Sequence, residues 1–126
     1  MSVRVYLAAG PAGVESLRRD GVCEAPTFAV TPQLRETGAD EEDLEYEVFR
    51  IAEDVARAAG EVVVVVAADV PENAVTWSTD GVGVQVGPVP LRAVVSLHVE
   101  EDGAGPDDEL LWYDAAELDD VAALLA

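Results

Sequence analysis

The sequence has 126 residues, of which 50% are hydrophobic. It contains 26 acidic residues but only seven arginines and no lysine, so its net charge is −19. Phosphate backbones and anionic lipids require clustered cations, so this balance argues against nucleic acid or a membrane surface as a partner. We expect a cytoplasmic protein with one globular domain over residues 1–126, because the apolar run VVVVVAA is too short to span a bilayer and no signal sequence is recognisable.

The first quarter of the chain predicts a strand, a helix, a second strand and a helical turn. Residues 3–7 (VRVYL) alternate between apolar and polar, as a strand with one buried face does. Gly-Pro at 10–11 favours a helix start, and Gly21 provides a left-handed stop. A short strand at 27–30 (TFAV) then leads into a helical turn that begins with Thr-Pro at 31–32.

A long helix and an inner strand follow. We expect the helix to begin near Asp40, whose carboxylate should cap its free amides. Apolar residues at three- and four-residue spacing give this helix one buried stripe, while Glu53 and Arg57 are spaced to pair on its exposed face. Gly60 ends the helix. The segment VVVVVAAD at 62–69 shows no alternation, which predicts a strand covered on both faces in the middle of a sheet.

Residues 75–86 (VTWSTDGVGVQV) predict a β-hairpin. Asp80-Gly81 between two alternating runs is typical of a type I′ turn, which needs positive φ at both central residues. This turn predicts a register of three pairs: Thr79 opposite Val82, Trp77 opposite Val84, and Val75 opposite Val86. The apolar face of the hairpin, which includes Trp77, should therefore belong to the core.

The segment AVVSLHVE at 93–100 predicts a further strand whose apolar face consists of Val95, Leu97 and Val99. The opposite face carries a hydroxyl, an imidazole and a carboxylate on Ser96, His98 and Glu100. Side chains two residues apart on a strand stand about 7 Å apart, too far for the hydrogen bonds that nucleophilic catalysis uses. We therefore expect His98 to face the solvent.

After an acidic loop, residues 109–114 (ELLWYD) predict a short strand with an aromatic residue on each side. We expect Trp112 to face the core together with Leu110, which leaves Tyr113 beside the solvent. Asp114 and a glutamate three residues later form a carboxylate version of the capping box at the start of the last helix. Together these elements predict an α+β fold with a mixed, largely antiparallel sheet and about three helices packed mainly on one face.

Six segments resemble a family of small acidic actinobacterial proteins catalogued as domain of unknown function 6912: RVYLAA, TFAVTPQLRE, DEEDLEYE, VVVAADVP, GPVPLRAVVSLHVEED and ELLWYDAAEL. They occur in this order over nearly the whole chain. Many members of the family carry a longer alanine-rich stretch where this chain has its acidic loop at 100–109. The resemblance implies a cytoplasmic actinobacterial protein but no activity, cofactor or catalytic residue.

Two functions from different classes are compatible with the residues. The first is a non-enzymatic protein-interaction module that presents an acidic face and one aromatic contact, Trp112 or Tyr113, to a partner that we expect to be basic. The alternative is an enzyme or a small-anion-binding domain with a pocket at the strand ends, lined by Asp69, His98, Arg35 and Arg92.

We expect no cofactor and no dedicated metal site. The acidic residues lack the spacing of a calcium loop, and the glycines lack the pattern of a phosphate-binding loop. The single cysteine, Cys23, can form neither an internal disulfide nor the thiolate set of a structural zinc site. No catalytic set is recognisable, which is why the interaction module is the preferred interpretation.

Overall fold

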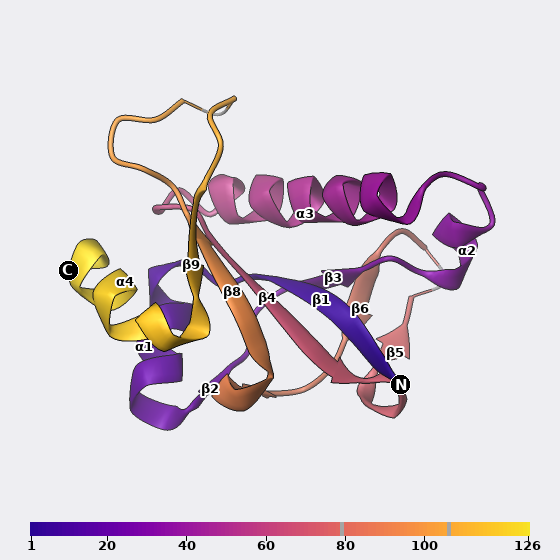
Figure 1. The fold of residues 1–126 in the computed structure, drawn as a ribbon, viewed down its shortest axis with the longest axis horizontal. Helices are drawn as coiled ribbons and strands as arrows, with labels where there is room; N and C mark the ends of the chain where they lie inside the picture. The colour runs from indigo at the N-terminus through magenta and orange to yellow at the C-terminus, as the bar shows by residue number, and fades with distance from the viewer. Residues whose placement is uncertain (79, 106) are drawn as a thin grey trace.

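The computed structural model describes residues 1–78, 80–105 and 107–126, and a seven-stranded sheet runs through it (Figure 1). The strand order is β5-β6-β3-β1-β4-β8-β9, and each neighbouring pair is antiparallel. The strands are β1 (Ser2–Ala8), β3 (Thr27–Ala29), β4 (Val64–Pro71), β5 (Thr76–Trp77), β6 (Gly83–Gln85), β8 (Val94–Val99) and β9 (Leu111–Asp114). A separate two-stranded sheet pairs β2 (Val22–Cys23) with β7 (Val89–Pro90).

The helices lie on both faces of the large sheet. One face carries α3 (Glu41–Ala58), which follows the short α2 (Pro32–Arg35); the other carries α1 (Gly10–Asp20) and α4 (Leu118–Leu125), which pack together (Figure 1). The short 3-10 helices are η1 (Glu72–Ala74), η2 (Leu91–Ala93) and η3 (Ala115–Glu117). Within the described residues, every helix is too short or too polar to cross a membrane.

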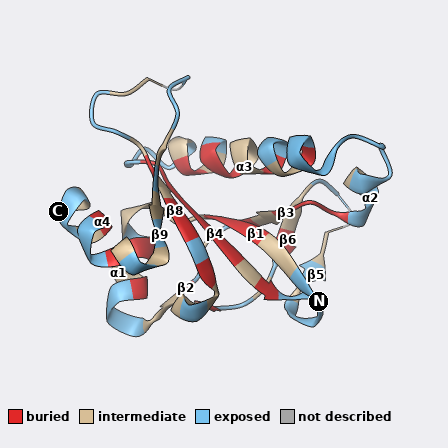
Figure 2. Ribbon diagram, in the orientation of Figure 1, coloured by how far each residue is buried: buried red, intermediate tan, exposed pale blue. Residues whose placement is uncertain are grey.

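The predicted α+β class and the antiparallel sheet are confirmed, but the helices are divided between the two faces and not gathered mainly on one. The reason lies in the inner strands, which supply apolar side chains to both faces. On β1, Leu7 joins the core under α1 and α4, while its neighbour Tyr6 joins the core under α3. β4 is buried along most of its length (Figure 2), which confirms the interpretation of the valine segment as an inner strand.

Most local signals at the helix ends are confirmed. Gly21, with φ of 72°, ends α1, and the Thr31 hydroxyl accepts a hydrogen bond from the first turn of α2. Asp114 and Glu117 form the predicted capping box, which opens η3 and leads into α4. The side chain of Asp40 makes no capping hydrogen bond, so its predicted role is wrong; the first turn of α3 is exposed, and water can reach its amides.

The β5–β6 ladder has the predicted register, with Trp77 opposite Val84. Gly81, at the turn, has φ of 69°, but the described residues with positive φ are all glycines, so the predicted type I′ turn, which also needs positive φ at Asp80, is not confirmed. The predicted pairing of Thr79 with Val82 lies outside the described residues, because it includes residue 79. Trp77 is partly buried and packs against the core under α1 and α4, in agreement with its predicted core position.

A β-bulge in β8 changes the predicted alternation of that strand. Ala67 lies opposite Ser96, but the next residue, Ala68, lies opposite Val94. The intervening Val95 is 36% exposed, whereas Val94 is buried. The prediction that Val95 shares a face with Leu97 and Val99 is therefore wrong, because an extra residue in one strand moves the preceding side chains to the other face.

A buried carboxylate ties α3 to the end of β8. Glu53 is only 2% exposed and accepts hydrogen bonds from Arg57 Nη2 at 2.9 Å and from Arg50 Nη1 at 3.3 Å. Arg57 Nη1 also donates to Glu100 at 2.6 Å, and Glu100 accepts from the backbone N–H of Val63. The pair of Glu53 and Arg57 thus lies partly in the interior and not on an exposed face as predicted.

We expect Glu53→Ala to lower the free energy of unfolding by roughly 2–4 kcal/mol, because it leaves two guanidinium groups without their shared carboxylate in a partly buried place. Urea unfolding followed by circular dichroism measures this change. Glu47→Ala, at an exposed position of the same helix, is the matched control and should change the free energy by less than about 0.5 kcal/mol. Equal effects of the two substitutions would contradict a stabilising role for the buried network.

Candidate functional site

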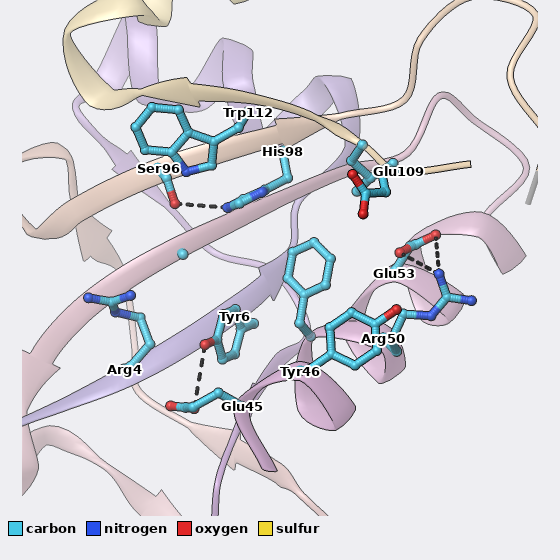
Figure 3. A pocket seen from close by; sticks show the side chains of 13 residues that line it. Arg4, Tyr6, Glu45, Tyr46, Arg50, Glu53, Ser96, His98, Glu109 and Trp112 are labelled. Atoms are coloured by element: carbon cyan, nitrogen blue, oxygen red, sulfur yellow. Dashed lines mark hydrogen bonds and ion pairs between the residues drawn. The ribbon is translucent and has the colours of Figure 1, made fainter. Parts of the chain in front are cut away.

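The face of the sheet that carries α3 is only partly covered. α3 packs on β3, β1 and β4, and beyond it a groove of about 390 Å³ opens between α3 and β9 (Figure 3). We call it the aromatic groove. Its floor contains Tyr6, Ala67, Ser96 and His98; its α3 wall contains Glu45, Tyr46, Phe49, Arg50 and Glu53; its β9 wall contains Glu109, Leu110 and Trp112; and Arg4 also lines it.

A chain of aromatic contacts runs from β1 through α3 to β8 and joins the floor of the groove to its α3 wall. The ring of Phe49 meets Tyr6 edge-on, with 5.9 Å between the ring centroids, and meets His98 in the same way at 4.9 Å. His98 Nε2 lies 2.8 Å from the hydroxyl of Ser96 (Figure 3). The prediction that these side chains are too far apart to hydrogen bond is wrong, because they lean toward one another.

Burial of the floor changes how its groups ionise. Desolvation lowers the pKa of His98 to about 4, and the positive charge of Arg4 acts in the same direction, so the imidazole is neutral at pH 7. Desolvation also raises the pKa of Tyr6 to about 12, with a further contribution from the negative charge of Glu45. The pKa of the Glu45 carboxyl is itself raised, first by burial and then by Glu41.

The hydrogen bond between Ser96 and His98 resembles part of a catalytic triad, but its surroundings differ from one. β8 is paired with β4 on one side and β9 on the other at both residues, so their backbone amides take part in the sheet and do not form an oxyanion hole. The carboxylate of Glu100 is bound to Arg57 and Val63. Among the hydrogen bonds of the described residues, none joins a carboxylate to His98.

The exposed aromatic residue of β9 is Trp112, and the prediction of its orientation is wrong. Trp112 is 62% exposed and lies opposite His98 in the β8–β9 ladder, on the face of the groove. Tyr113 is partly buried and packs against the core under α1 and α4. The exchange follows from the placement of the helices: α4 folds back over the face of β9 that carries Tyr113, while α3 does not reach the other face.

Charged groups of both signs line the groove, and both of its arginines are paired. Arg4 makes two hydrogen bonds to Asp69, at 2.6 and 3.2 Å, and Arg50 pairs with the buried Glu53. Glu45 accepts only the long hydrogen bond of 3.4 Å from the Tyr6 hydroxyl, within the described residues. Two carboxylates on opposite walls, Glu45 and Glu109, therefore lack a guanidinium partner among the described ion pairs.

The residues proposed for a strand-end pocket do not come together. His98 lines the groove. Asp69 does not line it, but it accepts a hydrogen bond from Arg4, which does. Arg35 donates to Glu41 at 2.8 Å where α2 meets α3, and Arg92 lies in η2, outside the groove. In the ranges that the structure describes, no group of three or more His, Cys, Asp or Glu residues has the arrangement to hold a metal ion.

Sequence reasoning missed most residues of the groove, among them Arg4, Tyr6 and Glu45. The alternation of the first strand does place Arg4 and Tyr6 on one face, opposite the apolar side chains. That signal was compatible with an exposed face, because nothing in the pattern of one strand shows which helix covers it. Glu45 follows Leu44 at the edge of the buried helix stripe and resembles an ordinary surface residue.

Comparison with known proteins identifies a family and no activity. The model of a family of unknown function, DUF6912, matches residues 3–107. This range contains β1 except Ser2, all of β2 to β8, the whole groove floor and its α3 wall, and it ends before β9. Neither the curated proteins nor the solved structures contain a significant match to this chain.

The lowered pKa of His98 predicts a pH-dependent contribution to stability. In the unfolded chain His98 takes up a proton near its ordinary pKa of 6.5, whereas in the fold it does so only near 4. Between these values the unfolded state binds more protons, so this contribution falls as the pH is lowered from about 6.5 to about 4. Urea unfolding of wild type and His98→Gln at pH 7 and pH 4.5 measures it.

The difference in unfolding free energy, wild type minus His98→Gln, should be smaller at pH 4.5 than at pH 7. Taking this difference removes the effect of the many carboxylates, which both proteins share. A difference that stays constant over this range would contradict a buried, neutral imidazole in the fold.

Proposed function

The chain belongs to the family of unknown function DUF6912, and we propose that it is a non-enzymatic protein-interaction module whose aromatic groove receives a segment of a basic protein partner. The observation that carries this proposal is the 62% exposure of Trp112 on the wall of the groove. A cytoplasmic location and an actinobacterial source are parts of the same proposal, and they rest on the composition and on the family resemblance.

The groove combines two properties of protein-binding sites. Its walls carry two large exposed aromatic rings, Trp112 at 62% and Tyr46 at 64% exposed, and tryptophan and tyrosine are enriched among residues that dominate binding energy. Its floor is held in place by the contacts of Phe49 with Tyr6 and His98, so a partner would lose little free energy in ordering it.

The charge of the chain supports a basic partner. With a net charge of −19, the molecule attracts cations over distances near the Debye length and repels anionic surfaces. In the part of the chain that the structure describes, ion pairs with acidic residues occupy five arginines: Arg4, Arg18, Arg35, Arg50 and Arg57. Few cations of the chain itself therefore compete with those of a partner for the remaining carboxylates.

The alternative, an enzyme or a small-anion site, is favoured by one observation, the hydrogen bond between Ser96 and His98 in the floor of the groove. Acyl transfer also needs donors for the developing oxyanion and a group that orients the histidine. The pairing of β8 on both sides argues against backbone donors at this point. Arg35 and Arg92 lie outside the groove, which argues against an anion site formed by these two residues.

Affinity capture with the purified protein tests the interaction. We expect Trp112→Ala to lose the proteins that wild type captures from a lysate of the source organism, because the substitution removes the exposed anchor. Leu124→Ala, which truncates a 55% exposed apolar side chain on α4, is the matched control and should capture the same proteins as wild type. Capture that is equal with Trp112→Ala, or lost equally with Leu124→Ala, would argue against the groove.

A serine-directed probe tests the non-enzymatic part of the proposal. We expect a fluorophosphonate to leave Ser96 unlabelled after an hour, since the residue is 4% exposed and lies within a paired strand. Mass spectrometry of the intact protein detects the adduct, and Ser96→Ala serves as the blank. Labelling that requires both Ser96 and His98 would favour the enzymatic alternative.

A further inference from the structure

We infer that the aromatic groove binds the guanidinium group of an arginine side chain, with the cation held between the exposed ring of Trp112 and the unpaired carboxylates of Glu45 and Glu109. This inference rests on the proposed function and names the chemical group by which the partner is recognised. It is carried by the aromatic lining, by the charges of the two walls and by their arrangement across one groove.

The aromatic lining provides several ring faces and edges within one concavity. Trp112 and Tyr46 stand exposed on opposite walls (Figure 3), and between them the ring of Phe49 contacts those of Tyr6 and His98. The face of an aromatic ring attracts a cation, and tryptophan does so most strongly. The imidazole of His98 adds no positive charge at pH 7, so it does not oppose a cation above it.

More carboxylates than guanidinium groups line the groove, so its charge favours one further cation. The groove is lined by three carboxylates, Glu45, Glu53 and Glu109, and by two guanidinium groups, Arg4 and Arg50. Arg50 is bound to Glu53, and Arg4 is bound in bidentate fashion to Asp69, an acid outside the lining.

Glu45 and Glu109 then remain, one on each wall, without a cationic partner among the described residues. The Glu45 carboxyl loses part of its solvation by burial, as the raised pKa of this group reflects. A cation that replaces this lost solvation is more strongly bound than one on an open surface.

The shape of the site favours arginine over lysine. A guanidinium is planar and weakly hydrated, so it stacks on an indole and still donates two parallel hydrogen bonds to a carboxylate at its edge. An ammonium group retains its water more strongly and has no flat face to lay on Trp112. An anion would face two unpaired carboxylates and the field of a molecule with a net charge of −19.

The fluorescence of Trp112 provides a direct test with a small probe. The sequence has two tryptophans, so Trp77→Phe leaves Trp112 as the sole reporter. In this background we expect N-acetyl-arginine amide to change the emission saturably, and N-acetyl-citrulline amide, its neutral isostere, to have no effect. A single arginine avoids the nonspecific attraction that a polycation would have for this acidic protein.

Variants that each remove one negative charge test which carboxylates bind the arginine. In the Trp77→Phe background, Glu45→Gln and Glu109→Gln should each weaken arginine binding by roughly threefold to tenfold, since each removes a charge-assisted hydrogen bond. Glu24→Gln removes one negative charge at an exposed position outside the groove and should leave the affinity unchanged. If Glu24→Gln weakens binding as much as the two groove variants do, bulk charge explains the attraction and the inference is overturned.

The remaining outcomes separate this inference from the proposed function. Equal binding of citrulline, or of N-acetyl-lysine amide, overturns the assignment to a guanidinium, as does the absence of any saturable change. If Trp112→Ala abolishes capture of a protein partner while arginine does not bind, the inference fails and the proposed function stands. If arginine binds but capture is independent of Trp112, the arginine site stands and the proposed function fails.

Discussion

The width of a single helix is the constraint on which the candidate site depends. An α-helix with its side chains is about 10 Å across, and neighbouring strands lie about 4.8 Å apart, so one helix covers two or three strands. α3 is the long helix on its face of a seven-stranded sheet, and it packs on β3, β1 and β4. The outer part of that face, on β8 and β9, is left without a helix, and the aromatic groove lies there.

On this face of the sheet, the strands that α3 does not cover carry different side chains from the strands that it covers. The inner strands carry valine and alanine, whose side chains α3 buries. β8 and β9 instead carry polar or amphipathic side chains on that face, namely Ser96, His98 and Trp112. Such side chains can lie next to both apolar neighbours and water. The buried link of Glu53, Arg57 and Glu100 fixes α3 beside them, so the α3 wall of the groove has a defined position.

Charge acts on two scales in this molecule. At short range the arginines are used within the fold, as in the bidentate pair of Arg4 with Asp69 between β1 and β4. At long range the excess of acidic residues gives the molecule a strongly negative net charge. The first effect neutralises the guanidinium groups that line the groove, and the second attracts external cations toward it. Together they make a positively charged group the natural complement of an aromatic groove.

The sequence by itself determined the local elements, because the signals for them are local. The helix stops at Gly21, the capping box at Asp114 and Glu117, the pairing of Trp77 with Val84 and the buried nature of β4 all follow from a few neighbouring residues. The family, too, was recognisable from the order of the segments. These predictions needed no knowledge of which face each helix covers.

Only the tertiary structure decided which side of each strand meets water. The bulge at Val95 exchanged the predicted orientation of Val94 and Val95, and the packing of α4 placed Tyr113 in the core and Trp112 in the groove. Alternation along a strand assigns side chains to two faces, but it does not say which face a distant helix will cover. The groove is assembled from β1, α3, β8 and β9, and so its existence depended on contacts between residues far apart in the chain.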